Sequence, residues 1–363
     1  MSAYHNIILL SRHSLKFYPF YSLLSEIIVY STVRMEPMIS PLVQLVQDIS
    51  RIAIPIIIVV GVLSNVLNIL VLTRPALYQH ACSRYFLALA IGNLFYCGVI
   101  LVYRLLADQY QIDPAKSSNG LCKFIIYAGQ LGIFLAPSFI VLASIDRWCI
   151  SSTNPQLRKF SSIKTARWMI VSNTILFAII FSNSAIAVDL RDTDPFECTI
   201  RADTLYKQVY AIVQVCIMSV IVPALMAVFG LLTIYNINKA RVTPAEMSRH
   251  RRTGNQLIRM LLLQVGTHIV LSLPSSVTYL IYVLPGDIKY RPEFFAAVLF
   301  CILPLHVSYI TAFFLYVISA QVYRKELIRL FYRIFRPNAQ NQVHSLTHTN
   351  NTMPMGNRQT VEQ

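Results

Sequence analysis

Seven long apolar segments dominate the sequence and restrict the folds that are open to it. They cover residues 52–73, 83–106, 123–150, 164–188, 205–237, 256–284 and 293–319. Each reaches the length of about 20 residues that a helix needs to cross a hydrocarbon layer of roughly 30 Å. Because backbone amides find no water inside a bilayer, such segments cross it as helices with internal hydrogen bonds. The sequence therefore predicts an all-α bundle of seven transmembrane helices.

The composition agrees with a membrane protein. Hydrophobic residues make up 55% of the 363 residues and charged residues only 13%, whereas soluble domains carry about 25% charged residues. The formal net charge of +15 could suggest a nucleic-acid partner. The basic residues, however, flank the apolar segments and are not interleaved with aromatic residues in a groove-like pattern. We therefore expect no binding to nucleic acid.

The basic residues instead orient the bundle. The segments that we assign to the cytoplasm hold 18 Lys and Arg against three acidic residues, whereas the three opposite loops hold eight basic and nine acidic residues. Lys and Arg collect on the cytoplasmic side of membrane proteins. We therefore expect a multi-pass plasma-membrane protein with its N-terminus outside and its C-terminus in the cytoplasm.

The N-terminal part of the chain carries no clear span. We expect residues 1–50 to form an extracellular segment and residues 51–320 to form the transmembrane domain. Met35 is an alternative to Met1 as the start of the protein.

The chain after the last span divides in two. In residues 321–337, apolar side chains at helical spacing lie opposite Lys and Arg, and Pro337 ends the run. This pattern is typical of a short amphipathic helix on an anionic membrane surface, so membrane lipid is an expected partner. Residues 338–363 are polar and are expected to form a disordered cytoplasmic tail.

Asp146-Arg147-Trp148 ends the third apolar segment and points to a function. An arginine at the inner end of a membrane helix is costly unless it has a partner and a task. Asp146 can form a local ion pair that holds Arg147 inside the bundle. The alternative is that Arg147 only anchors the helix on the positively charged side.

This tripeptide and its surroundings resemble rhodopsin-like (class A) G-protein-coupled receptors. Cys122 lies 25 residues before Arg147, which is the spacing of that family. The other matching positions are Asn65 and Asn93 as polar helix anchors, Pro223 and Pro274 as helix-bending prolines, Tyr316 at the end of the seventh segment, and Tyr323 at the start of an eighth helix. The resemblance covers about residues 52–337. In style it is most similar to divergent invertebrate neuropeptide receptors of the FMRFamide type.

The resemblance implies roles for several of these residues. Asp146, Arg147, Trp148 and Tyr316 are expected to serve activation and coupling to a heterotrimeric G protein. Of the seven cysteines, only Cys122 and Cys198 lie on the oxidising outer side of the predicted topology. We therefore expect these two to form a disulfide.

Other positions depart from the family's pattern. Asn93 stands where most members have aspartate, residues 311–316 lack the Asn-Pro pair, and Pro274 lacks the preceding Cys-Trp. Asn93, Ala136 and Ala312 cannot supply the charge or the oxygens that hold a hard cation. We therefore expect no metal site, no cofactor and little effect of sodium on ligand affinity. The resemblance implies that the Asn-Pro and Cys-Trp pairs take part in activation. Because both are absent here, the sequence leaves the activation mechanism open.

The class of ligand is less constrained. An amine receptor would carry an aspartate at Gly129 and a retinal protein a lysine at His306, so both are disfavoured. The polar or aromatic residues that we expect to face a ligand pocket are Gln130, Phe134, Gln214, Tyr279, Tyr282 and His306. Each could instead serve packing between helices. Glu197 and its acidic neighbours in the second outer loop could steer a basic peptide, or could simply be solvated.

The sequence thus predicts a receptor that transduces an extracellular ligand, by preference a neuropeptide, to intracellular G proteins. An orphan chemosensory receptor for small molecules is the alternative. A transporter would need a buried charge pathway, and the middle of the spans is nearly free of charged residues. An enzyme is disfavoured because neither Gly-x-Ser-x-Gly nor His-Glu-x-x-His occurs.

Overall fold

The computed structural model describes residues 41–190, 198–200, 209, 212–214, 216–240, 249–283 and 291–335. Our expectations for residues 1–40, for the tail and for Glu197 concern residues outside this set.

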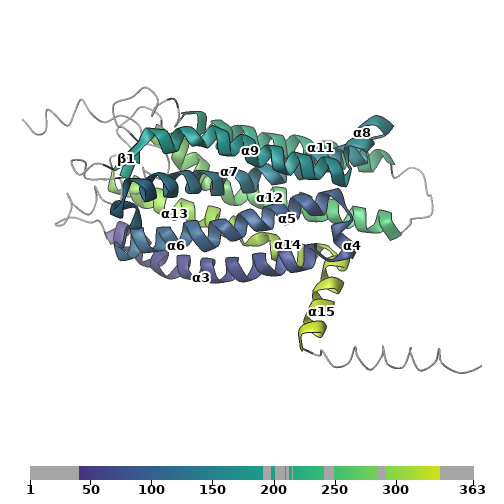
Figure 1. Cartoon of the computed structure of the whole chain (residues 1–363), viewed down its shortest axis with the longest axis horizontal. Helices are drawn as coiled ribbons and strands as arrows, with labels where there is room; N and C mark the ends of the chain where they lie inside the picture. Colours follow the sequence, from purple (N-terminus) through teal and green to yellow (C-terminus); the bar gives the residue numbers. More distant parts are fainter. Residues whose placement is uncertain are drawn as a thin grey trace, which may run out of the picture.

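Long helices run side by side along the longest axis of the molecule and form one bundle (Figure 1). The first half of the chain forms α3 (Pro41–Leu72), α4 (Pro75–Tyr78), α5 (Ala81–Phe95), η1 (Tyr96–Ile100), α6 (Leu101–Arg104), η2 (Leu105–Gln109), η3 (Pro114–Ser117), α7 (Asn119–Ser151), α8 (Pro155–Phe160) and α9 (Ile163–Ala187). The second half forms β1 (Val188–Leu190), β2 (Cys198–Ile200), η4 (Cys216–Ile221), α11 (Val222–Ala240), α12 (Arg249–Val283), α13 (Pro292–Ser308), α14 (Thr311–Ser319) and α15 (Gln321–Phe335).

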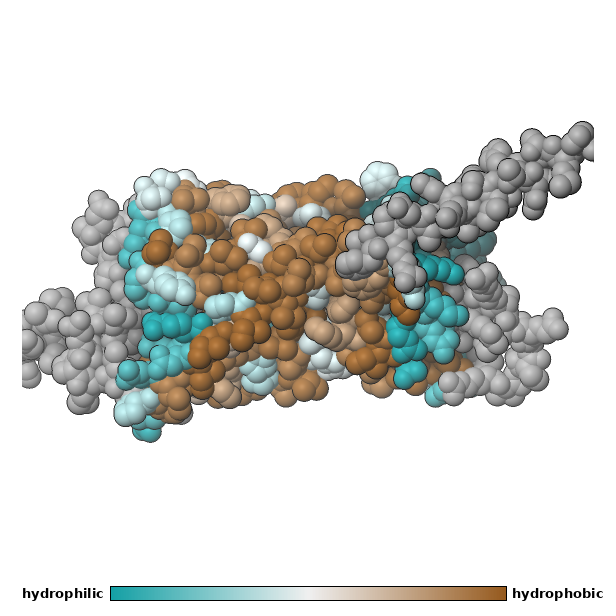
Figure 2. All heavy atoms as spheres, turned by 90° about the horizontal axis from the view of Figure 1, so that it is seen from below, coloured by the Kyte–Doolittle hydropathy of each residue, from teal (hydrophilic) through white to brown (hydrophobic). Residues whose placement is uncertain are grey.

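The prediction of a seven-helix bundle is confirmed. Six of the described helices are long and apolar enough to cross a membrane, and the bent pair of α13 and α14 supplies a seventh span. A broad hydrophobic band covers the middle of the molecule, with hydrophilic residues at both ends of it (Figure 2). The one addition to the all-helical prediction, within the described residues, is an antiparallel pair of short strands in which Leu190 of β1 lies opposite Cys198 of β2.

The first span begins earlier than its apolar segment predicts. Helix α3 starts at Pro41, ahead of the expected start at residue 52. Val43, Val46 and Ser50 are buried at helical spacing and continue the buried face that Ile54 forms further along. A narrow buried stripe of this kind extends a helix without making the segment apolar on all sides.

The seventh span is broken where the sequence predicts one helix over residues 293–319. Helices α13 and α14 meet at an angle of 45°, and Tyr309 and Ile310 form a turn between them. The bend lies in the span that lacks the family's Asn-Pro pair. Pro304, inside α13, removes one backbone donor in the turn before the break.

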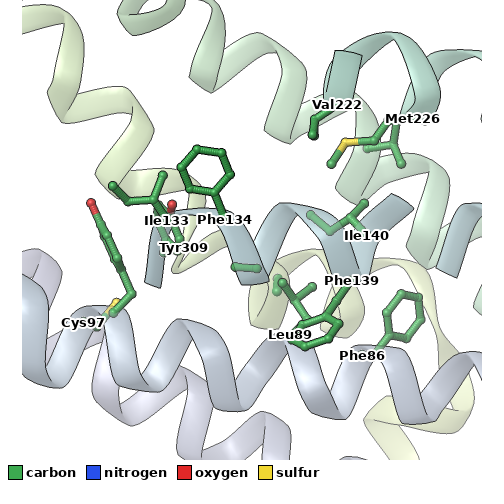
Figure 3. Packing of buried hydrophobic residues seen from close by; sticks show 14 of the residues in the cluster. Phe86, Leu89, Cys97, Ile133, Phe134, Phe139, Ile140, Val222, Met226 and Tyr309 are labelled. Carbon is green, nitrogen blue, oxygen red and sulfur yellow. The ribbon is translucent and has the colours of Figure 1, made fainter. Parts of the chain in front are cut away.

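Helix α7 lies at the centre of the bundle. Of its most apolar stretch, 78% is buried, against 11% for α9, so α9 lies at the periphery. Phe139 and Ile140 of α7 pack against apolar residues of α5 and α11 (Figure 3), and Phe134 of α7 packs against Phe181 of α9. Beside this core, α3 and the second span cross closely, since a Cβ atom at Gly61 would lie 2.6 Å from the Cys97 Sγ.

Helix α15 leaves the bundle at a steep angle (Figure 1). Tyr323, Glu326 and Leu330 are buried at helical spacing, and Lys325 and Arg333 are exposed. The predicted amphipathic helix is therefore present, with its buried face against the inner end of the bundle.

Candidate functional site

The side chains of Asp146 and Arg147 form a closed group near the C-terminal end of α7. Arg147 is only 4% exposed. Its Nε and Nη2 atoms donate to the Asp146 Oδ2 at 3.0 and 2.5 Å. The other carboxylate oxygen of Asp146 accepts from the Ser161 hydroxyl at 2.7 Å. Asp146 thus holds Arg147 through one oxygen and the loop after α8 through the other.

The structure shows no bond from this group to the described side chains of α12, residues 256–281. Within the described part of the chain, the hydrogen bonds and ion pairs of the Arg147 side chain go to Asp146 alone. A buried charge that depends on one partner costs much free energy if that partner is removed. Arg147 is therefore held in place by its neighbour Asp146.

Contacts between α7 and α11 flank this group. The ring of Trp148 lies 5.5 Å from that of Phe229. The Asn236 amide donates to the Ser151 hydroxyl at 3.2 Å. These contacts tie the inner ends of the third and fifth spans together.

Tyr316 of α14 packs between the second span and α15. It is fully buried, with its ring 5.0 Å from Phe86 and 5.7 Å from Tyr323. Its hydroxyl has no hydrogen-bond partner among the described residues. The neighbouring Tyr323 hydroxyl donates to the Asn68 Oδ1 at 2.6 Å, and burial raises the pKa of Tyr323, so this donor stays protonated. Helix α15 is thereby fixed to α3.

Asn65 bridges α3 and the break in the seventh span. Its side-chain amide donates to the backbone oxygen of Gly61 at 2.8 Å and to that of Tyr309 at 3.1 Å. A carbonyl in a helix break has lost its intrahelical partner, and burying it unpaired is unfavourable. Asn65 supplies the missing donor. Asn93 is also buried, and its Oδ1 has no partner among the described residues.

Three prolines, one each in the third, fifth and sixth spans, differ in where they lie along their helices. Pro137 is inside α7 and Pro274 inside α12. Pro223 is the second residue of α11, which directly follows the π-helical stretch η4. A proline has no N–H, and its ring clashes with the carbonyl four residues earlier, so a wider turn before it accommodates the ring.

A disulfide joins Cys122 at the outer end of α7 to Cys198 in β2, as the sequence predicts. The two Cα atoms are 5.7 Å apart. Val188 of β1 and Ala115 of η3 pack against the bridge. The disulfide therefore fixes the strand pair over the outer end of the third span.

A cavity of about 60 Å³ lies among α7, the fifth span, α12 and α13. It has room for several water-sized groups. Its lining residues are Ile133, Pro137, Gln214, Ser219, His268, Ser272, Ser275, Ser276, Tyr279, Leu305 and Tyr309. None of these described lining residues is an Asp, Glu, Lys or Arg. The cavity is thus uncharged and mostly apolar, with a few polar side chains in its lining.

Gln214 and Tyr279, which the sequence predicts to face a pocket, both line this cavity. The buried Gln214 Oε1 has no hydrogen-bond partner among the described residues. The side chain of Tyr282 lies outside the described part.

The other predicted pocket residues lie elsewhere. The His306 Nδ1 is 3.0 Å from the Tyr96 hydroxyl. Phe134 packs against Phe181 of α9, with 4.4 Å between the ring centroids. Gln130 is buried, and its Oε1 has no partner among the described atoms.

The sequence analysis missed a stripe of polar residues along α12, of which it predicted only Tyr279 to face a pocket. His268, Ser272, Ser275 and Tyr279 follow one another at steps of four, three and four residues, so they share one helix face. All four are buried and line the cavity. The signal was present as helical periodicity of polar residues in an apolar segment, which marks the inward face of a membrane helix.

A buried ion pair at the outer end of the second span was also missed. The Arg104 Nη1 lies 3.1 Å from the Asp108 Oδ2, and both side chains are largely buried. Arg104 lies inside the predicted second segment, 83–106, and Asp108 lies beyond it. Two π-helical stretches carry the helix on to Gln109, three residues past the predicted end, and so place both residues on one helix.

A family model described as a 7 transmembrane receptor (rhodopsin family) matches residues 64–320. The match begins next to Asn65 and ends directly before α15. It includes the Asp146–Arg147 group, the disulfide and the cavity. No curated protein matches the chain.

Proposed function

Because the chain belongs to the rhodopsin family of seven-transmembrane receptors, a family of membrane receptors for extracellular ligands, we propose that it couples a peptide ligand to heterotrimeric G proteins. In this proposal the N-terminal segment, 1–50, lies outside the plasma membrane, and residues 51–320 form the receptor domain. Residues 321–337 lie along the inner membrane surface, and 338–363 form a cytoplasmic tail.

The geometry of Arg147 carries the proposal of G-protein coupling. Its guanidinium is buried, is held by one local carboxylate and is not bonded to α12 among the described residues. A guanidinium released from Asp146 would present several donors to backbone carbonyls of a partner helix. The ligand would act by favouring the released state over the closed one.

The cavity is too small to enclose a drug-sized ligand as a whole. Drug-sized ligands fill pockets of about 300–1,000 Å³, and this cavity measures about 60 Å³. It fits one end of a ligand whose remainder lies nearer the outer surface. Since no charged side chain is among the described lining residues, that end is an uncharged, hydrogen-bonding group. The acidic outer loop that would steer a basic peptide lies outside the described residues.

A small-molecule ligand is the second candidate, and the size of the cavity is the observation that favours it. A compound of a few heavy atoms would be enclosed by Gln214, His268 and Ser275 without an outer vestibule.

A panel of basic and neutral peptides and of small polar compounds, applied to cells that express the full chain with a promiscuous G protein, tests the proposal. The control variants, matched for surface level, are Arg147→Ala and Arg333→Ala, the second of which removes an exposed arginine of α15. We expect a peptide response that Arg147→Ala abolishes and Arg333→Ala retains. A response to small compounds alone would contradict the peptide ligand. A response that survives in Arg147→Ala would contradict the role of Arg147.

A further inference from the structure

Arg84, the fourth residue of α5, is a buried cation with no carboxylate partner among the described residues. It is 8% exposed. Its Nε atom donates to the Tyr78 backbone oxygen at 2.9 Å, and its guanidinium lies over the Tyr78 ring, 3.0 Å from the centroid. These contacts use one of the five N–H donors of the side chain and supply no negative charge. The other two buried arginines of the described chain, Arg104 and Arg147, are each paired with an aspartate.

The start of α5 adds to the positive charge around Arg84. The side chain of the N-cap residue, His80, makes no capping hydrogen bond, and the first turn of the helix contains no acidic residue. Because the N-terminus of a helix is the positive end of its dipole, a cation in the first turn is unfavourable and an anion is favourable. Burial of an unpaired charge is unfavourable as well. A bound anion would remove both penalties.

The neighbouring helix start is also basic. Helix α9 packs against α5. The two helices follow the short helices α8 and α4, which lie at the same end of the bundle (Figure 1). Lys164 and Arg167, near the start of α9, are exposed, and the first turn of α9 contains no acidic residue. An anion that approaches this end of α5 is therefore attracted by further cations.

We propose that Arg84 and the start of α5 bind a phosphate group. A guanidinium and a phosphate form two parallel charge-assisted hydrogen bonds. The Nη1 and Nη2 atoms of Arg84 make no hydrogen bond within the part of the chain that the structure describes, so both can serve this purpose. The helix N-terminus favours the same ligand. This site does not depend on the proposed coupling at Arg147.

The position of Arg84 favours a phospholipid as the source of the phosphate. Arg84 lies at the start of the second apolar segment, 83–106, after the short loop that joins it to the first. Loops between spans lie at the level of the lipid headgroups. In the proposed orientation this is the cytoplasmic leaflet, whose lipids carry a net negative charge. A soluble phosphate compound is the other source, and the experiment distinguishes the two.

The experiment measures binding to the purified full chain in an uncharged detergent, from the rise in Tm that a ligand of the folded state produces. The probes are dioctanoyl phosphatidic acid, dioctanoylglycerol, which lacks only the phosphate, and inorganic phosphate. We expect phosphatidic acid to raise the Tm and dioctanoylglycerol to leave it unchanged. An equal rise with inorganic phosphate would identify soluble phosphate compounds as the source, and no rise with inorganic phosphate would identify lipid headgroups.

Substitutions at Arg84 link the binding to this side chain. Arg84→Gln removes the charge, and we expect the apparent affinity for phosphatidic acid to fall about tenfold or more, as the loss of a hydrogen bond to a charged group implies. Arg84→Lys keeps the charge without the planar fork, so its affinity should lie between these two. The matched control is Arg158→Gln, which removes an exposed arginine of α8 at the same end of the bundle and should bind as the wild type does. Each variant is compared with its own Tm without ligand, so a loss of stability is not mistaken for a loss of binding.

Four results would overturn the site. The first is a wild-type chain whose Tm rises with neither phosphatidic acid nor inorganic phosphate. The second is an equal affinity of the wild type and Arg84→Gln for the phosphate probe that binds. The third is a rise with dioctanoylglycerol as large as that with phosphatidic acid, because the phosphate would then not be recognised. The fourth is a loss in Arg158→Gln as large as that in Arg84→Gln, because binding would then reflect the basic surface in general.

Discussion

Replacing Asn65 by alanine tests how the break in the seventh span is stabilised. Asn65 is fully buried, and its amide donates to the Tyr309 carbonyl at 3.1 Å. The variant removes this bond between α3 and the break. An unsatisfied buried group costs about 1–3 kcal/mol, and polar contacts between membrane helices average about 0.6 kcal/mol, with values up to about 1.7.

We therefore expect Asn65→Ala to lower the free energy of unfolding by about 1–2 kcal/mol, which corresponds to a fall in Tm of roughly 1–3 °C for a chain of this size. Ser64→Ala is the matched control. Ser64 is a buried neighbour whose hydroxyl donates within α3, to the Gly61 carbonyl at 3.2 Å. Its loss leaves the contact between α3 and the seventh span intact, so the fall in Tm should be below about 1 °C.

The protein carries its own reporters for this measurement. The free cysteines Cys82, Cys97 and Cys149 are buried, so a thiol-reactive dye labels them when the bundle unfolds. A thermal ramp of the purified chain with the dye gives the Tm of each variant. If Asn65→Ala and Ser64→Ala melt at the same temperature, the bond to Tyr309 does not stabilise the break, and the reasoning fails.

Three further predictions concern stability. Replacing both Cys122 and Cys198 by serine removes a crosslink with a sequence separation of 76, worth about 4–5 kcal/mol in the chain-entropy model. The amount of receptor at the cell surface, measured by flow cytometry, should fall several-fold, and an unchanged amount would contradict this. Gly61→Ala places a methyl group 2.6 Å from the Cys97 Sγ and should cost about 1–3 kcal/mol through overpacking. Adding Cys97→Ala should restore part of the lost Tm, and the absence of any rescue would show that the strain lies elsewhere. Tyr323→Phe removes a buried hydrogen bond to α3 and should lower the Tm by an amount that corresponds to about 1 kcal/mol. A wild-type melting curve would refute that contribution.

The spans could be predicted from the sequence because burial in lipid requires an apolar surface over a fixed length. The start of α3 could not, because Val43, Val46 and Ser50 form a narrow buried stripe that a search for apolar segments does not detect. The break in the seventh span could not be predicted from the sequence either. The donor that satisfies it, Asn65, lies 244 residues away from Tyr309 in the sequence, so its contribution exists only in the folded bundle.

The candidate site was predicted in part for the same reason. The disulfide followed from topology, since only Cys122 and Cys198 face the oxidising side. The polar face of α12 was not predicted, because a single His268 or Ser272 among apolar neighbours does not indicate a site. Only the folded bundle shows that both line a cavity with Gln214 of the fifth span.

The most direct test of the account is nucleotide exchange on a purified heterotrimeric G protein by the full chain in lipid nanodiscs. Asp146→Asn weakens the hold on Arg147 and leaves its guanidinium in place, whereas Arg147→Ala removes the group that the account assigns to the G protein. The account predicts that Asp146→Asn exchanges nucleotide faster than the wild type and that the double variant Asp146→Asn, Arg147→Ala does not exceed the rate without receptor. Equal rates for Asp146→Asn and the double variant would contradict it.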